Sequence, residues 1–381
     1  MIMTDIMQAF HEEADRNLAN PHRETFLEKK QKEYAINDNI EYPDPDYLIE
    51  IGGTPTMPKG NLVALSAKWK NGKTFFCDVL SAIYLGSDRF TGCRSRHPAG
   101  KVVFFDTEQA MSDTARIRKT IKAMTDEQRH EDLEVYCLRN AGIDSEGDND
   151  EMSRFDFISQ TIAHDRPDLV VIDGIADLIY NYNDVIESQE VVNKLAAIAN
   201  ENDCCIIVVM HQNKSMMDKN MKGHLGTMLY QKCSDVFNVE KHGTVFVASH
   251  AISRHRNCED ICFKLNDDAI PVDAVADRQQ QIELEHQQSE ARLQEMLAPV
   301  IPEDGIPVKR SVIVDHLVEN YPFKRAKAYQ ILNKAIQKGW LIEVDRSTVK
   351  LNTEQTDGRM DEAGASTSGR LFAPSITRQA F

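Results

Sequence analysis

Short apolar runs alternate with longer helix-compatible segments through the first two thirds of the sequence, and this alternation is the strongest constraint on the fold. The runs are expected to be strands, at residues 47–51, 62–66, 101–106, 133–138, 169–173, 205–210 and 244–249. Segments 113–124, 150–163 and 188–202 lie between them and are compatible with helices. Strands that are apolar along their whole length are typical of a parallel sheet covered on both faces. The sequence therefore predicts an α/β fold with a mostly parallel sheet flanked by helices.

The run at 62–66 leads through a short loop into Gly72-Lys73-Thr74 and a helix-compatible segment. This order matches the second half of the phosphate-binding pattern GxxxxGK[ST], in which backbone N–H groups surround a phosphate, the lysine reaches its oxygens and the hydroxyl binds Mg²⁺. Ala67 replaces the first glycine, so the start of the loop is expected to differ from the usual form. The predicted nucleotide-binding residues are Ala67, Lys68, Trp69, Lys70, Asn71, Gly72, Lys73, Thr74 and Phe75.

Polar side chains end the other apolar runs. Asp106 ends the strand at 101–106, and Glu108 comes two residues later. Asp173 ends the strand at 169–173, and His211 and Gln212 follow the strand at 205–210. Ligands of open α/β sheets bind at the carboxyl ends of the strands, so these groups are expected to gather beside the phosphate loop. Glu108 would polarise the attacking water, Asp173 would hold Mg²⁺ through its water shell, and His211 or Gln212 would sense the terminal phosphate.

In this order the motifs resemble those of the RecA-like ATPases, particularly the RepA-like hexameric replicative helicases of plasmids and mobile elements. The resemblance covers roughly residues 47–266. It implies ATP and Mg²⁺ as cofactors, Glu108 as the catalytic carboxylate, and a homo-oligomer, usually a ring. It also implies that the segment between His211 and the glycine-rich Gly223–Gly226 stretch is a channel loop that contacts single-stranded DNA. The lysines of that loop are Lys214, Lys219 and Lys222.

Two arginines follow the strand at 244–249. Arg254 and Arg256 resemble a Lys-x-Arg element that reaches the terminal phosphate of a neighbouring subunit, with Arg256 as the finger and Arg254 in the lysine position. The alternative is that two exposed arginines merely end a strand. Arg116, eight residues after Glu108, is a weaker candidate for stacking on adenine.

Three other functions stay open. Lys68 lies where partition and septum-site ATPases of the ParA/MinD type carry a signature lysine, but Trp69 and Lys70 replace their glycines, and Glu108 has no counterpart in that group. A nucleotide-gated DNA-binding regulator would use the same phosphate loop without unwinding. A recombinase would assemble as a filament rather than as a ring.

The chain divides into five expected parts by composition. These are an acidic arm at 1–46 that includes a possible helix from Met3 to Leu18, the RecA-like ATPase domain at 47–266, a polar linker helix at 267–304, a small domain at 305–352 and a disordered tail at 353–381. Residues 277–298 are rich in Gln and Glu, and few of their apolar residues recur at helical spacing. A solvated linker is therefore favoured there over a partner-binding coiled coil.

The small domain is expected to be a winged helix that binds duplex DNA or a replication protein. Val312, Ile313, Leu317 and Val318 fit one helix, a second helix ends at Gly339, and two short strands flank Asp345-Arg346. Residues 305–351 carry nine bases and four acids. The second helix begins near Lys324, Arg325 and Lys327, where helix-turn-helix proteins place groove-contacting residues.

The formal net charge of −16 argues against a protein that coats DNA indiscriminately, because backbone binding needs clustered Lys and Arg. No apolar run is long enough to span a bilayer, and the start of the chain lacks the features of a secretory signal, so a cytoplasmic protein without membrane partners is expected. The eight cysteines form no CxxC pair. Cys258, Cys262 and His255 lack a complete zinc-ligand spacing, so reduced thiols are favoured over a metal site.

Overall fold

The computed structural model describes residues 25–42, 44–97, 100–141, 152–213 and 220–353. The chain forms two compact units. The first comprises residues 1–261 with 265–272, and the second comprises 262–264 with 273–381. The expected helix from Met3 to Leu18 and nearly all of the expected tail lie outside the described residues.

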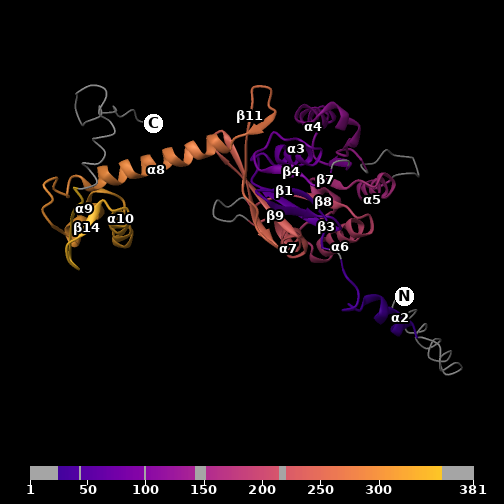
Figure 1. The fold of residues 1–381 in the computed structure, drawn as a ribbon, viewed down its shortest axis with the longest axis horizontal. Helices are drawn as coiled ribbons and strands as arrows, with labels where there is room; N and C mark the ends of the chain where they lie inside the picture. Colours follow the sequence, from indigo (N-terminus) through magenta and orange to yellow (C-terminus); the bar gives the residue numbers. More distant parts are fainter. Residues whose placement is uncertain (1–24, 43, 98–99, 142–151, 214–219, 354–381) are drawn as a thin grey trace. The chain divides into compact units, whose positions relative to one another are not determined.

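The described residues form a nine-stranded sheet in the order β12-β11-β10-β9-β3-β8-β7-β5-β6 (Figure 1). The stretch from β9 to β6 is parallel throughout, and β10 runs antiparallel to β9. The expectation of a mostly parallel sheet is confirmed. The strands are β3 (Asn61–Ala67), β5 (Val102–Asp106), β6 (Leu133–Cys137), β7 (Leu169–Asp173), β8 (Cys205–His211), β9 (Asp235–His242), β10 (Val245–Ser253), β11 (Ile261–Leu265) and β12 (Pro271–Asp273).

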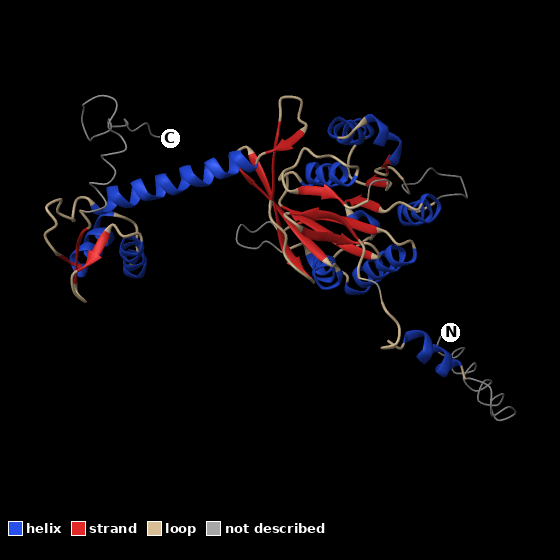
Figure 2. Ribbon diagram, in the orientation of Figure 1, coloured by secondary structure: helices blue, strands red, loops and turns tan. Residues whose placement is uncertain are grey.

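Helices cover both faces of this sheet (Figure 2). One face packs against α5 (Arg154–Asp165), α6 (Val185–Glu201) and α7 (Gly223–Lys232). On the opposite side lie α3 (Lys73–Tyr84) and α4 (Met111–Met124) (Figure 1). The described connections include two 3₁₀ helices, η1 (Glu127–Asp132) and η2 (Ile175–Leu178). Every residue of β5 and β7 is buried, which explains why these strands are apolar along their whole length.

β9 is a central strand that hydrophobicity did not predict. Its Asn238, Glu240 and Lys241 interrupt the apolar pattern, although the strand lies between β3 and β10. The parallel pairing of β9 with β3 extends the sheet beyond the phosphate-loop strand. A smaller sheet in the order β2-β1-β4 consists of β2 (Thr54–Pro58), β1 (Tyr47–Ile51) and β4 (Cys93–Ser95).

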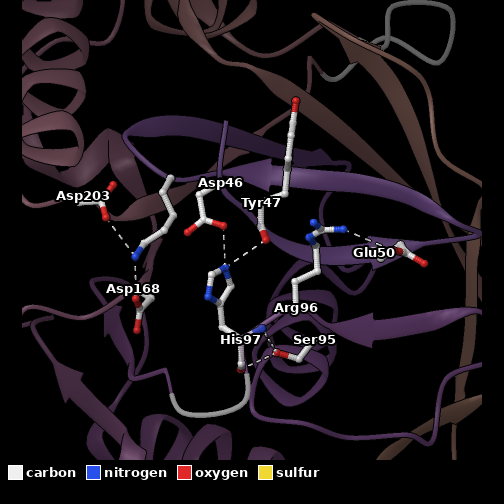
Figure 3. Close-up of polar contacts among 9 residues, drawn as sticks. Asp46, Tyr47, Glu50, Ser95, Arg96, His97, Asp168 and Asp203 are labelled. Carbon is white, nitrogen blue, oxygen red and sulfur yellow. Dashed lines mark hydrogen bonds and ion pairs between the residues drawn. The ribbon is translucent and has the colours of Figure 1, made fainter. Parts of the chain in front are cut away.

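Ion pairs hold the start of the first unit to the amino ends of the parallel strands (Figure 3). Lys59 Nζ lies 2.9 Å from Asp168, the residue just before β7, and 3.1 Å from Asp203, which lies two residues before β8. His97 Nε2 lies 3.0 Å from Asp46, where the chain enters β1. These polar contacts lie at the edge of the sheet opposite the carboxyl ends of β3, β7 and β8, so they stabilise the scaffold rather than the expected site.

The N-terminal arm contains one described helix, α2 (Phe26–Tyr34). Thr25 and Glu28 form a capping box, in which the Thr25 hydroxyl accepts from Glu28 N–H and the Glu28 carboxylate accepts from Thr25 N–H. None of the α2 residues is buried. The helix therefore owes its start to capping rather than to packing.

The second unit contains the two helices and the hairpin expected from the sequence. Its elements are α8 (Val275–Leu297), β13 (Val308–Lys309), α9 (Arg310–Asn320), α10 (Arg325–Gln337), β14 (Leu341–Glu343) and β15 (Thr348–Leu351), with the sheet order β13-β15-β14. The short strand β13 was not expected. The buried face of α9 also differs from the expectation, because Ile313, Val314 and Leu317 are buried whereas Val312 and Val318 are exposed.

The end of α8 belongs to the hydrophobic core of this unit. Leu293, Met296 and Leu297 are buried in one cluster with residues of α9 and α10. The sequence favoured a solvated linker here because the first five turns of the helix are polar. Three apolar residues in the last turns were too few to produce a periodic pattern, yet they suffice to anchor the helix.

Among the described residues, no helix combines the length and apolarity needed to cross a membrane. All eight cysteines are free thiols, and five of them are buried. The described residues hold no group of three or more His, Cys, Asp or Glu side chains arranged to bind a metal.

Replacing Leu293 with Ala is expected to destabilise the second unit by about 2–5 kcal/mol, because it leaves a cavity in a closed core. Leu284→Ala in the same helix is the matched control, since Leu284 is exposed. Its effect should stay within about 0.5 kcal/mol. Urea unfolding of the full chain measures both changes. Equal effects of the two variants would show that the end of α8 is not part of the core.

Candidate active site

The strand register brings the expected site residues to one edge of the sheet. Ala67 at the end of β3 pairs with His211 at the end of β8, and Asp106 of β5 pairs with Asp173 of β7. Because these strands are parallel, their carboxyl ends and the loops that follow them lie side by side. The phosphate-loop, carboxylate and histidine segments therefore converge, as their positions in the sequence suggested.

The phosphate loop depends on Gly72. Its φ of +80° is a left-handed conformation, and it is the N-cap of α3. A Cβ at this position would lie 2.6 Å from the ring of Phe246, a buried residue of β10. Ala67 needs no such freedom, because it is the last residue of β3 and pairs with strands on both sides. The replacement of the usual first glycine is thus accommodated as ordinary extended backbone.

The middle of the loop faces solvent. Trp69 is 73% exposed, and Lys70 Nζ lies 4.3 Å from the centroid of its ring. Lys70 has a φ of +61°, and Asn71 N–H donates to Lys68 O at 3.2 Å, which closes the turn before Gly72. Phe75, after the GKT triplet, is half-buried at the start of α3.

His211 lies between the lysine of the loop and the expected catalytic carboxylate. Lys73 Nζ is 2.9 Å from His211 Nδ1, and His211 Nε2 is 3.7 Å from Glu108 Oε1. An ammonium group can only donate, so Nδ1 accepts and the ring proton lies on Nε2, facing Glu108. His211 lowers the pKa of the Glu108 carboxyl, while burial lowers the pKa of Lys73. Glu108 is therefore ionised at neutral pH.

The placement of Glu108 is set by its neighbour Asp106. The buried Asp106 carboxylate accepts from Glu108 N–H at 3.1 Å, from Gln109 N–H at 3.0 Å and from the Thr114 hydroxyl at 2.7 Å. Asp106 thus organises the turn between β5 and α4, and its oxygens are occupied by that task. Of the two acids that end this strand, Glu108 is the one that faces His211.

Thr74 and Asp173 bring two oxygen donors together. The Thr74 hydroxyl donates to Asp173 Oδ2 at 2.6 Å, and burial raises the pKa of Asp173 to about 6. A buried carboxylate beside a hydroxyl fits Mg²⁺, which prefers oxygen ligands and takes most of them from phosphates and water. The pair is therefore suited to the metal of a magnesium nucleotide.

Gln212 lies on the other side of β8 from the Lys73–Glu108 pair. Its Nε2 donates to Ser66 Oγ at 3.0 Å and lies 3.4 Å from Asn238 Oδ1, and Ser66 Oγ donates to the same Asn238 oxygen at 2.5 Å. Of the two expected phosphate sensors, His211 is the one near Lys73. Ser66 and Asn238 were missed. Ser66 could have been noticed as a polar residue within a mostly apolar strand, whereas Asn238 lies in a strand with several other polar residues.

The segment after His211 is closed at its base. Lys222 N–H donates to His211 O at 3.0 Å, and Asn213 N–H donates to Asn220 O at 2.9 Å. Gln212 and Met221 form an isolated antiparallel β-bridge between these two bonds. Lys222 is the N-cap of α7. Lys214 and Lys219 lie outside the described residues. Any displacement of His211 therefore acts directly on both ends of this loop.

The remaining described candidates are exposed side chains. Arg256 is exposed after β10, whereas Arg254 donates to Lys232 O at 2.7 Å. Arg116 is exposed on α4. In the second unit, Lys324 is the exposed N-cap of α10 and Lys327 is exposed on its first turn. Arg325 pairs with Asp315 of α9 at 2.8 Å.

Asp173→Asn is expected to stabilise the nucleotide-free protein above about pH 6, because the native state must keep a buried carboxylate ionised there. The shift of the pKa from 3.8 to about 6 corresponds to roughly 3 kcal/mol of unfolding free energy. The gain should shrink as the pH falls from about 6 toward 3.8, since Asp173 is then protonated in the native state. Urea unfolding across this range measures it. The exposed Asp88→Asn is the control, and a gain independent of pH would contradict the assignment.

Comparison with known proteins supports this geometry. Residues 28–217 match the family described as AAA domain, and this match covers about half of the chain. No curated protein matches the chain. The matched region contains the phosphate loop, Glu108, Asp173 and His211, whereas Arg254, Arg256 and the second unit lie beyond it. The chain therefore contains an AAA-type P-loop ATPase domain, whose central sheet is mostly parallel and flanked by helices.

Proposed function

We propose that this chain is an ATP-dependent DNA motor that works as a homo-oligomer, in the manner of the RepA-like replicative helicases or accessory ATPases of plasmids and mobile elements. One observation carries the proposal. The imidazole of His211 contacts the phosphate-loop lysine, while its backbone carbonyl holds Lys222 at the base of the expected DNA loop. Nucleotide binding and loop position are thus linked through a single residue.

The hydrolytic step needs a carboxylate, a cation and an oriented water. Lys73 binds the phosphate oxygens, which requires it to leave His211 Nδ1. Glu108 orients the water whose oxygen attacks the terminal phosphorus, and its negative charge draws the water proton as the bond to the ADP oxygen breaks. Mg²⁺ bound beside Thr74 and Asp173 would offset the charge of the phosphates. His211, released from Lys73, is then free to follow the terminal phosphate.

The loop would convert that change into movement along a strand. A shift of His211 moves the carbonyl that accepts from Lys222 N–H, and the paired ends of the loop move together. Lys222 offers a positive charge at this position, and Lys214 and Lys219 add two more in the sequence. Phosphates of single-stranded DNA are the natural ligands of such a lysine group.

The register supports the action of Arg256 on a neighbouring subunit. Ser253 at the end of β10 pairs with Asp235, and Asp235 pairs with Val63 near the amino end of β3. The phosphate loop begins at the other end of β3, after Ala67. Four residues of strand separate these levels by roughly 13 Å. β10, the strand that leads to Arg256, thus ends at the edge of the sheet opposite its own nucleotide site.

The second unit would give this motor a further contact. Lys324 and Lys327 are exposed at the start of α10, the helix that a winged-helix domain presents to a DNA groove. Their exposure also favours a second candidate function, a nucleotide-gated regulator that binds duplex DNA without unwinding it. A replication protein is the other partner that this surface could take.

ATPase rates with and without single-stranded DNA test the motor. At low salt, single-stranded DNA should raise the turnover rate of the full chain by roughly tenfold or more, and rising salt should weaken this effect. Lys73→Ala should abolish nucleotide binding. Glu108→Gln should keep binding and lower turnover on the order of 10²–10⁴-fold.

No stimulation at any salt concentration, together with duplex binding by the full chain, would favour the regulator. Equal loss of nucleotide binding in the Lys73 and Glu108 variants would contradict their separate roles.

Complementation tests the arginine. Arg256→Ala and Glu108→Gln subunits should each be nearly inactive alone, because one lacks the finger and the other lacks the carboxylate. Mixed and reassembled in equal amounts, they should regain turnover well above the sum of the separate preparations, since some intact sites then face an intact Arg256. If Arg256 acted on its own subunit, mixing would restore nothing.

A further inference from the structure

His250 of β10 is buried and held on three sides. Its ring stacks on Phe237 with centroids 4.6 Å apart and planes 8° from parallel. Nε2 lies 2.9 Å from Asp235 Oδ1, and Nδ1 lies 3.0 Å from the backbone nitrogen of Cys258. A backbone N–H can only donate, so Nδ1 accepts and Nε2 donates to Asp235. The ring is thus fixed in one orientation and one tautomer.

Asp235 ties this ring to the central sheet. It is the first residue of β9 and pairs in register with Val63 of β3. Its other carboxylate oxygen accepts from Met57 N–H at 3.3 Å and from the Ser234 hydroxyl at 3.2 Å. The imidazole therefore connects β3, through Asp235, to the group that is hydrogen-bonded to its Nδ1.

What Nδ1 holds is the far end of the segment that carries Arg256. The near end is fixed separately, because Arg254 N–H donates to Ser234 O at 3.0 Å and its guanidinium donates to Lys232 O at 2.7 Å. The Cys258–His250 bond fixes the far end. Arg256 lies midway and is exposed, and within the described residues the structure shows no hydrogen bond or ion pair of its guanidinium. The backbone is thus hydrogen-bonded at both ends of the segment, while the Arg256 guanidinium can bind another group.

We propose that His250 is a positioning residue that keeps Arg256 in reach of the nucleotide of a neighbouring subunit. This inference rests on the proposed action of Arg256 in trans. An arginine on a segment fixed at one end only must be ordered each time it reaches a phosphate, which costs conformational entropy in the transition state. The buried ring removes that cost in advance, without touching the nucleotide itself.

Three substitutions separate positioning from simple stability. In His250→Asn the amide oxygen can replace Nδ1 as the acceptor for Cys258 N–H, whereas the longer His250→Gln places its polar atoms toward Asp235. We expect His250→Ala and His250→Gln to lower the turnover rate by roughly 10–100-fold with nucleotide affinity unchanged, and His250→Asn to recover most of it. His242→Ala, at the end of β9, is the matched control and should behave as wild type.

Complementation with Glu108→Gln subunits supplies the decisive measurement. His250→Ala subunits keep an intact phosphate loop and Glu108, so an Arg256 from a Glu108→Gln neighbour should restore their turnover, as it should for Arg256→Ala subunits. If Arg256→Ala is rescued and a folded His250→Ala is not, the positioning role is wrong while the proposed function stands. If Arg256→Ala itself is not rescued, the trans action fails instead.

Thermal unfolding establishes whether each variant is folded. Should His250→Ala fail to fold, the Asn and Gln variants carry the test in the same mixtures. Two results together would support the role. Unmixed His250→Asn would turn over faster than unmixed His250→Gln, and Glu108→Gln subunits would rescue the turnover of His250→Gln. Equal turnover of the two variants, or a change in nucleotide affinity that accounts for the loss, would overturn it.

Discussion

The register of β3 against β8 is the constraint on which the rest of the site depends. It sets Ala67 opposite His211, and the contact between His211 and Lys73 follows from that pairing. A shift of one residue would turn His211 toward the opposite face and bring Gln212 to the lysine instead. The register is secured by burial, since β8 is buried from Cys205 to Met210 and helices cover both of its faces. A hydrophobic core that contains no catalytic group thus decides which polar group meets the nucleotide.

Much of this arrangement could be predicted because strands of a covered parallel sheet are near-continuous hydrophobic runs in the sequence. The runs ending at Asp106, Asp173 and His211 are apolar throughout, and their carboxyl ends had to meet once the sheet was parallel. β9 escaped prediction because Asn238 and Glu240 break its pattern. Asn238 is polar for a reason that only the tertiary structure shows, since it completes the Ser66–Gln212 network beneath the phosphate loop.

Other features were beyond reach of local patterns. The ring of Phe246 over Gly72 joins residues far apart in the chain, and an aromatic residue in a strand carries no mark of that task. The end of α8 is similar, because three apolar residues enter a core whose other members follow in the sequence.

The net charge of the chain is informative only when it is calculated segment by segment. The excess of acids in the total of −16 conceals a stretch at 305–351 in which bases outnumber acids.

The exposed Trp69 has a consequence for how this protein can be observed. The chain contains two tryptophans, and Trp340 lies half-buried in the second unit, far along the sequence from the phosphate loop. Trp69 is 73% exposed and has a lysine ammonium over its ring. An indole in that setting emits at long wavelength and is sensitive to quenching by nearby charge. With Trp340 replaced by Phe, the chain therefore carries a single tryptophan, which lies within its own phosphate loop, and occupancy of the loop can be followed by tryptophan fluorescence without any attached label.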